Sequence, residues 1–134
     1  MRRVLKQASD GISGLGILLD ETICAGQILI DKQLLIEAGG INEYLPAKRK
    51  YELLIRVAWE QPVIFAEEKP EQEKEYVLLE DDESDVLLKY GWKADCYVAG
   101  RYSQKLQALG LLDDVVTALI TEAESNAREA VTIA

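Results

Sequence analysis

The chain contains no histidine among its 134 residues. Because histidine is the side chain that most readily changes protonation near neutral pH, its absence removes the usual general base. It also removes the Ser-His and Cys-His nucleophile pairs and the commonest zinc ligand. We therefore expect any chemistry to depend on carboxylates, lysine, tyrosine or cysteine.

Cysteine is scarce as well. Cys24 and Cys96 are the two in the chain, and they stand far apart in the sequence with no paired spacing. This arrangement is unlike a metal knuckle or a redox motif, and it predicts two small buried hydrophobic side chains. Unpaired thiols are typical of a reducing compartment. We therefore expect a cytoplasmic protein with no metal and no cofactor.

Long apolar runs and an excess of positive charge are also missing. No apolar run approaches the roughly 20 residues that span a bilayer, and no apolar core follows the basic start as in a secretory signal. The formal net charge is −9, with eight basic and eight acidic residues in residues 1–60 but seven and sixteen in residues 61–134. Without a basic stripe to neutralise phosphates, nucleic-acid binding is not expected.

Four segments follow one another along the chain. Residues 1–21 are weakly patterned and predict a flexible N-terminal lead-in, whose glycines lack the spacing of a phosphate-binding loop. Residues 22–66 predict a strand, a helix, a turn, a helix and a strand. Residues 67–85 carry ten acidic and two basic side chains, which predicts a solvated connection interrupted at residues 76–79 by an edge strand or a docked loop. Residues 86–134 predict a C-terminal helical hairpin.

The second segment has the clearest pattern. Residues 22–30 are rich in apolar and β-branched side chains and predict a buried strand. Asp31 suits a helix N-cap, and Gly39 can end that helix in the left-handed conformation. After Pro46, apolar side chains recur on one face of a second helix. These side chains are Tyr51, Leu54, Ile55, Ala58 and Trp59. A short strand is predicted at residues 63–66.

The C-terminal segment reads as two helices. Asp82 with Asp85 resembles a capping box, and apolar residues at spacings of three and four then predict a helix that Gly110 closes. The members of this stripe are Trp92, Cys96, Ala99, Tyr102, Leu106 and Leu109. Asp113 or Asp114 begins the last helix, and the short link predicts an antiparallel hairpin. The predicted fold class is α+β: a small sheet with two packed helices plus the C-terminal helical hairpin.

A longer motif lies within residues 23–60. A glycine and a hydrophobic strand precede a helix that ends in two glycines, a hydrophobic residue, an asparagine and a glutamate. A Leu-Pro turn and an aromatic-acid-leucine helix follow. The residues concerned are residues 26–30, Gly39, Gly40, Ile41, Asn42, Glu43, Leu45, Pro46, Tyr51, Glu52 and Leu53. This order resembles the acceptor-side half of family-two glycosyltransferases, which transfer a sugar from a nucleotide-sugar donor.

The resemblance implies a three-part mechanism. A metal-binding Asp-x-Asp and a nucleotide-binding fold belong to the family's N-terminal half, and too few residues precede the predicted strand to form that half. The third part is a Glu-Asp pair whose Asp accepts the proton of the acceptor hydroxyl. Arg49 and Lys50 occupy the positions of this pair, and a cation cannot accept that proton unless it is strongly desolvated. The resemblance places Gly39, Gly40 and Asn42 in the acceptor-side turn.

Other side chains near the turn are candidates for the missing role. Glu43, in the turn, and Glu52, in the next helix, are the alternative acids, and for both a capping or surface role is expected ahead of catalysis. Arg56 is expected to form a surface ion pair with Glu52, worth about a few tenths of a kcal/mol. Trp59 and Trp92 could stack on a sugar ring, but their helical spacing favours core packing.

We therefore expect a truncated glycosyltransferase-like module that is not catalytically competent alone and acts as an interaction or accessory module. The strand at residues 22–30 needs its edge covered by helices, by residues 76–79 or by another chain. A homodimer or docking to a fuller glycosyltransferase is accordingly expected. Two alternatives stay open. One is part of an active transferase completed by another polypeptide, and the other is a small helical adaptor that uses the stripe of residues 92–109.

Overall fold

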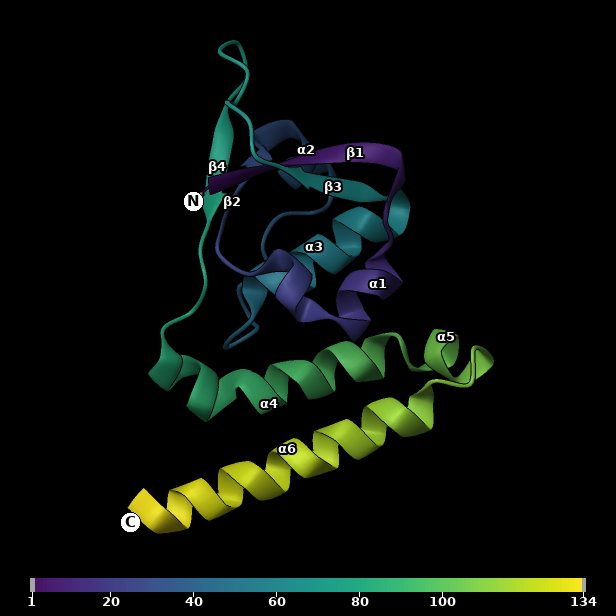
Figure 1. The fold of residues 1–134 in the computed structure, drawn as a ribbon, viewed down its shortest axis with the longest axis vertical. Coiled ribbons are helices and arrows are strands. Elements are labelled where there is room, and N and C mark those ends of the chain that lie inside the picture. Colours follow the sequence, from purple (N-terminus) through teal and green to yellow (C-terminus); the bar gives the residue numbers. More distant parts are fainter. Residues whose placement is uncertain (1, 134) are drawn as a thin grey trace. The chain divides into compact units, whose positions relative to one another are not determined.

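A mixed four-stranded sheet with helices confirms the α+β prediction (Figure 1). The computed structural model describes residues 2–133, and the side chains of residues 2–128. The elements in chain order are β1 (Arg2–Ile12), α1 (Gly14–Leu19), the 3₁₀ helix η1 (Glu21–Cys24), β2 (Gln27–Asp31), α2 (Lys32–Glu37), α3 (Arg49–Glu60), β3 (Val63–Ala66), β4 (Tyr76–Leu79), α4 (Ser84–Arg101), α5 (Ser103–Ala108) and α6 (Leu112–Ile133).

The chain divides into two units, which are described separately below. The first unit consists of Met1–Leu45 with Arg49–Asp81, and the second of Pro46–Lys48 with Asp82–Ala134. The first unit therefore holds the whole sheet, and the second holds the three C-terminal helices. The predicted boundaries at residues 22, 67 and 86 do not coincide with this division. The sheet includes one strand that precedes the segment 22–66 (β1) and one that follows it (β4).

The sheet has the strand order β3-β1-β2-β4. β1 runs parallel to β2, with Val4 opposite Leu29, and antiparallel to β3. β4 runs antiparallel to β2, with Leu29 opposite Leu78. Helices, residues 76–79 or another chain were expected to cover the edge of the strand now identified as β2. In the structure, residues 76–79 cover it as the edge strand β4. β1 pairs with the other side of β2.

Two expectations for the N-terminal part were wrong. Residues 1–21 were expected to be a flexible lead-in, but the described part, from residue 2 on, contains β1 and α1, and Val4 and Leu5 of β1 are buried. The strand expected at residues 22–30 begins only at Gln27, because the Asp20 side chain accepts a hydrogen bond from the Thr22 backbone N–H (3.2 Å) and starts η1 instead.

The glycine-rich segment serves close packing. A Cβ on Gly14 would lie 2.6 Å from the Ile55 carbonyl oxygen and 2.6 Å from a ring carbon of Trp59, so α1 approaches α3 more closely than any other residue would permit. Ser13 caps α1 by accepting a hydrogen bond from the Gly16 N–H at 3.1 Å. Figure 1 shows α1 and α3 lying together beneath β1 and β3.

α3 is buried on more than one face. The expected stripe is inside except for Trp59, which is 37% exposed, and Leu53 and Val57 outside the stripe are buried too. The Tyr51 hydroxyl donates a hydrogen bond to the Leu18 carbonyl oxygen at 2.6 Å, which ties α3 to α1. α3 is therefore a central helix of the first unit, enclosed by the sheet, α1 and the turn after α2.

The second unit contains the expected antiparallel pair, with α4 and α6 side by side and α5 between them in sequence (Figure 1). The helix expected through Leu109 is interrupted at Tyr102 and ends at Gly110, whose φ is +72°. The Trp92 indole N–H donates to the Leu119 carbonyl oxygen at 2.8 Å. Ala99 and Leu106 of the expected stripe are buried, whereas Trp92 and Leu109 are partly exposed.

The expected capping box is absent. Glu83 is the N-cap of α4 and makes no side-chain capping bond. The Asp82 carboxylate instead accepts a hydrogen bond from the Lys48 backbone N–H at 2.6 Å. Over residues 2–133, no helix combines the length and the apolar character that a membrane span requires.

Candidate functional site

The turn after α2 has the backbone geometry that its glycines suggested. Asp31 caps α2 as expected, because its carboxylate accepts a hydrogen bond from the Gln33 N–H at 2.9 Å. Gly39 and Gly40 have φ values of +94° and +79°. The Gly40 N–H donates to the Leu35 carbonyl oxygen at 3.0 Å, which is the long hydrogen bond of a Schellman helix stop. Side chains with a Cβ would be strained at both glycines.

Arg56 fixes this turn from α3. Its guanidinium donates to the Ala38 carbonyl oxygen at 2.6 Å and to the Gly40 carbonyl oxygen at 2.7 Å. It also forms a two-bond ion pair with Glu52, at 2.7 and 2.9 Å. The surface ion pair expected from the sequence is wrong, because the Glu52 side chain is 1% exposed and that of Arg56 is 15% exposed. Glu52 thus orients Arg56, and its carboxylate is turned away from solvent.

Asn42 and Glu43 shape the loop that follows. The Asn42 side-chain oxygen accepts a hydrogen bond from the Tyr44 N–H at 3.2 Å. The Glu43 side chain is exposed, while its carbonyl oxygen accepts a hydrogen bond from Arg49 at 2.7 Å. Arg49 also donates to the Leu45 carbonyl oxygen at 2.8 Å. Arg49, which the resemblance places at the first position of the acidic pair, therefore closes the loop that leads into α3.

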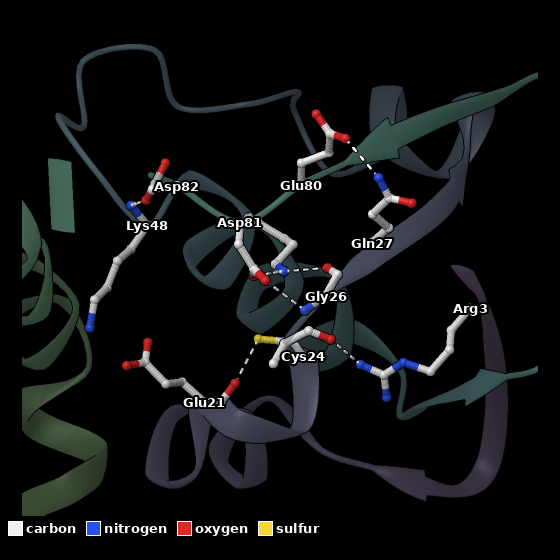
Figure 2. A network of polar contacts seen from close by, with 11 residues as sticks. Arg3, Glu21, Cys24, Gly26, Gln27, Lys48, Glu80, Asp81 and Asp82 are labelled. Atoms are coloured by element: carbon white, nitrogen blue, oxygen red, sulfur yellow. Dashed lines mark hydrogen bonds and ion pairs between the residues drawn. The ribbon is translucent and has the colours of Figure 1, made fainter. Parts of the chain in front are cut away.

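In the resemblance to family-two glycosyltransferases, Lys50 falls at the second position of the acidic pair. Its ammonium donates to the Gly26 carbonyl oxygen at 2.7 Å and pairs with the carboxylate of Asp81. The other Asp81 oxygen accepts a hydrogen bond from the Gly26 N–H at 2.8 Å (Figure 2). The Lys50 side chain is only 9% exposed, so this cation is largely withdrawn from solvent. Lys50, Asp81 and the Gly26 peptide thus form a closed arrangement, here called the Lys50 cluster.

The electrostatics of the Lys50 cluster favour an ionised Asp81. Partial burial raises its pKa, but the hydrogen bonds from Lys50 and from the Gly26 N–H outweigh burial and hold that pKa below its ordinary value. Each Asp81 oxygen already accepts a hydrogen bond within the cluster. A carboxylate so engaged is a poor proton acceptor, which argues for a structural role of the pair.

Further polar contacts surround the cluster (Figure 2). The Cys24 thiol donates to the Glu21 carbonyl oxygen at 3.1 Å, and Cys24 is 2% exposed, as expected for a buried small hydrophobic residue. Burial raises the pKa of Cys24 to about 11, so this thiol stays neutral at physiological pH. Arg3 donates to the Ala25 carbonyl oxygen at 2.6 Å, and the Gln27 amide donates to Glu80 at 2.9 Å.

The remaining acids do not converge on a metal position. Among the described residues, no group of three or more cysteine, aspartate and glutamate side chains is placed to hold a metal ion. Asp81 belongs to the Lys50 cluster, and the Asp82 carboxylate accepts a hydrogen bond from the Lys48 N–H.

A cavity of about 400 Å³ lies at the carboxyl end of β2. Its floor includes Val4 and Leu5, and its rim includes Asp31, Glu71 and Lys74. The rim charges pair with one another, since the Lys74 ammonium lies 3.6 Å from Asp31 and 3.5 Å from Glu71. None of the residues of the acceptor-side turn lines it.

Two members of the site were not expected from the sequence. Gly26 was assigned only to the strand, and Asp81 was assigned to a solvated acidic stretch. The sequence does contain a signal, since the one local cationic run, residues 48–50, is balanced by the acidic end of that stretch. Gly26 and Asp81 are 55 positions apart, however, and they meet because β2, which follows Gly26, pairs with β4, which precedes Asp81.

Comparison of the chain with protein-family models, with curated proteins and with solved structures found no match. The relation to family-two glycosyltransferases therefore stays an interpretation of residues 23–60. The structure adds the geometry of the turn and of the two cations that stand where the family has acids.

Proposed function

We propose that this chain is a glycosyltransferase-like module that is not catalytically competent alone and acts as an interaction or accessory module. The Lys50 cluster is the observation that supports the lack of catalytic competence. At the position of the family's general base stands a cation, whose ammonium is held by the Gly26 carbonyl oxygen and by Asp81 and is almost withdrawn from solvent.

The nearby acids do not replace the missing base. Glu52 is buried and bound on both oxygens by Arg56. The Glu43 side chain is exposed, and the contact that ties this residue into the loop is made by its backbone carbonyl oxygen, which accepts a hydrogen bond from Arg49. These contacts support a scaffold in which the former acceptor-side residues hold the turn together.

The accessory role would be exercised through a second copy of this chain or through a fuller glycosyltransferase. The need for a partner to cover β2 is weaker than the sequence suggested, because β1 and β4 flank that strand. Support comes instead from large apolar side chains that stay exposed in the second unit. These are Leu87, Leu88, Trp92, Tyr97, Leu109, Val116 and Ile120, at 37–55% exposure. Both cysteines are unpaired, which fits the cytoplasmic setting that we propose.

Two measurements test the two halves of the proposal. Incubation with several nucleotide-diphosphate sugars, a divalent metal and candidate acceptors should release no nucleoside diphosphate above the rate without protein. Sedimentation equilibrium over a wide concentration range should show self-association, or complex formation with a purified fuller glycosyltransferase. Turnover by the chain alone would contradict the first half, and a strict monomer without such a complex would contradict the second.

The two alternatives differ in what they predict. A fragment of an active enzyme would gain donor-dependent turnover when its partner polypeptide is added. A helical adaptor would bind through the stripe of residues 92–109, but Ala99 and Leu106 of that stripe are already buried. That burial leaves the stripe less available for a partner, so the glycosyltransferase-like module remains our proposal.

A further inference from the structure

One face of α6 is occupied by packing within the second unit. The Trp92 indole N–H of α4 donates to the Leu119 carbonyl oxygen at 2.8 Å, so these two residues lie at the contact between the helices. Partly buried side chains recur on α6 at spacings of three and four residues around Leu119. They are Leu112, Val115, Leu119 and Ala123. This stripe accounts for the packing of α6 on α4.

A second apolar stripe lies beside the first and is exposed. Its members are Val116, Ile120 and Ala127, whose spacings of four and seven residues place them on one side of α6. Val116 is 41% exposed and Ile120 is 55% exposed. Ile120 directly follows Leu119, which puts this stripe roughly 100° around the helix from the first. A helix with one neighbour needs one apolar stripe, so the second stripe indicates a second neighbour.

The side of α4 next to this stripe carries cations and an aromatic ring. Lys93 directly follows Trp92, as Ile120 follows Leu119. Because α4 and α6 are antiparallel, equal rotations away from their contact lead to the same side of the pair. Residues four positions before and after Lys93 share that side, and all three are exposed. The lateral face, as this surface is called below, consists of Lys89, Lys93 and Tyr97 of α4 with Val116, Ile120 and Ala127 of α6.

The two halves of the lateral face differ in charge. α4 has three basic and two acidic side chains, whereas residues 112–128 of α6 have one basic and four acidic ones. The two lysine ammoniums of the face lie 5.2 and 6.0 Å from the centre of the Tyr90 ring, which keeps the positive charge close to α4. On α6, Glu124 lies four residues after Ile120 and borders the exposed stripe. Opposite charges across an interface favour the matching partner and fix its orientation.

We propose that the lateral face binds a second copy of the chain, with α4 of each copy against α6 of the other. This inference rests on the proposed interaction role and names its partner. A second copy is the occupant because every chain carries both halves of the face, and a two-fold interface requires such self-complementarity. A two-fold axis parallel to the helices brings the lysines of α4 to the acidic α6 of the other copy and covers both exposed stripes. The result is a four-helix bundle in which every neighbouring pair is antiparallel.

Sedimentation equilibrium of the full chain tests this arrangement. The wild type should be dimeric at high concentration and should dissociate on dilution. Ile120→Glu places a charge in the face and should raise the dimer dissociation constant about tenfold or more. Because Ile120 is 55% exposed, this change spares the interior of the monomer. Leu109→Glu is the matched control, since Leu109 is 47% exposed and lies outside the face, and it should leave the constant unchanged.

A charge exchange tests the pairing of α4 with α6. Lys93→Glu should raise the dissociation constant about fivefold, because it puts a carboxylate against the acidic α6 of the other copy. Adding Glu124→Lys to the same chain should restore the wild-type constant, because each carboxylate then meets an ammonium again. The same sedimentation measurement follows both variants.

Three results would overturn the proposal. A wild type that stays monomeric at millimolar concentration would remove the second copy, while the interaction role would survive if the chain bound a fuller glycosyltransferase. A dimer on which Ile120→Glu and Leu109→Glu have equal effects would have its interface elsewhere, with self-association intact. A dimer that Lys93→Glu weakens and Glu124→Lys does not restore would not pair α4 with α6. The wild-type measurement and the charge exchange change no apolar side chain, so they stay decisive if Ile120→Glu fails to fold.

Discussion

At the scale of single residues, Arg56 is the side chain that links α3 to the turn after α2. It binds the buried Glu52 and two carbonyl oxygens of the turn after α2. Arg56→Met should lower the free energy of unfolding by about 3–5 kcal/mol, because a buried carboxylate loses its partner. Urea denaturation of the variant measures the loss. Arg128→Met is the matched control, since the Arg128–Glu124 pair has the same spacing but 80% and 63% exposed side chains, and its cost should stay below about 1 kcal/mol.

Lys50 gives a second prediction at this scale. Lys50→Asp places a carboxylate beside the Gly26 carbonyl oxygen and Asp81. The variant should lose about 2–4 kcal/mol of stability, because like charges meet and an acceptor loses its donor. Lys32→Asp breaks the pair with Glu75, whose side chains are 55% and 80% exposed, and should cost much less. Equal losses in the two urea titrations would show that the Lys50 cluster has no special structural role.

At the scale of elements, the contact of α1 with α3 depends on Gly14. Gly14→Ala should destabilise the protein by about 1–3 kcal/mol, because its Cβ would lie 2.6 Å from the Ile55 carbonyl oxygen. Gly100→Ala is the opposite control inside α4, where a Cβ meets nothing within 4 Å. That change should stabilise by about 0.4–1 kcal/mol, through reduced backbone freedom of the unfolded chain. A melting temperature that moves the same way in both variants would contradict this account of the glycine-rich segment.

The elements that the sequence predicted correctly are those with local signals. Asp31 and Gly39 mark the two ends of α2 through backbone chemistry that acts within a few residues. β1 could not be predicted in this way, because only Val4 and Leu5 are buried in its eleven residues and its pairing with two neighbours stabilises the rest. The Lys50 cluster was missed for a related reason, since it joins a residue of α3 to residues that flank β2 and β4 and lie far from it in the sequence.

At the scale of the whole molecule, the two units should respond oppositely to acid. Burial raises the pKa of Asp95, in the second unit, from 3.8 to about 6, so the folded state binds a proton where the unfolded chain does not. The stability of the second unit should therefore fall as pH rises from about 4 to 6. The pKa of Asp81, in the first unit, is lowered, so its contribution is present above the ordinary pKa and is lost as pH falls below it.

Hydrogen exchange resolved by residue measures the two responses separately. After correction for intrinsic exchange rates, amides of α4 and α6 should be better protected at pH 5 than at pH 7. Asp95→Asn should flatten that dependence, because an amide does not titrate. Protection that rises from pH 5 to pH 7 in the wild type would show that the sign of the Asp95 effect is wrong.

We propose above all that the chain has an acceptor-side turn like that of a glycosyltransferase but lacks the base, and that Lys50 serves the structure. The most direct test follows backbone amide shifts during titration with several nucleotide-diphosphate sugars and magnesium, with nucleoside diphosphate measured in the same samples. The account predicts no saturable shifts over residues 39–50 and no nucleoside diphosphate above the protein-free rate. Saturable shifts in that range together with turnover would contradict it and would make the chain an enzyme.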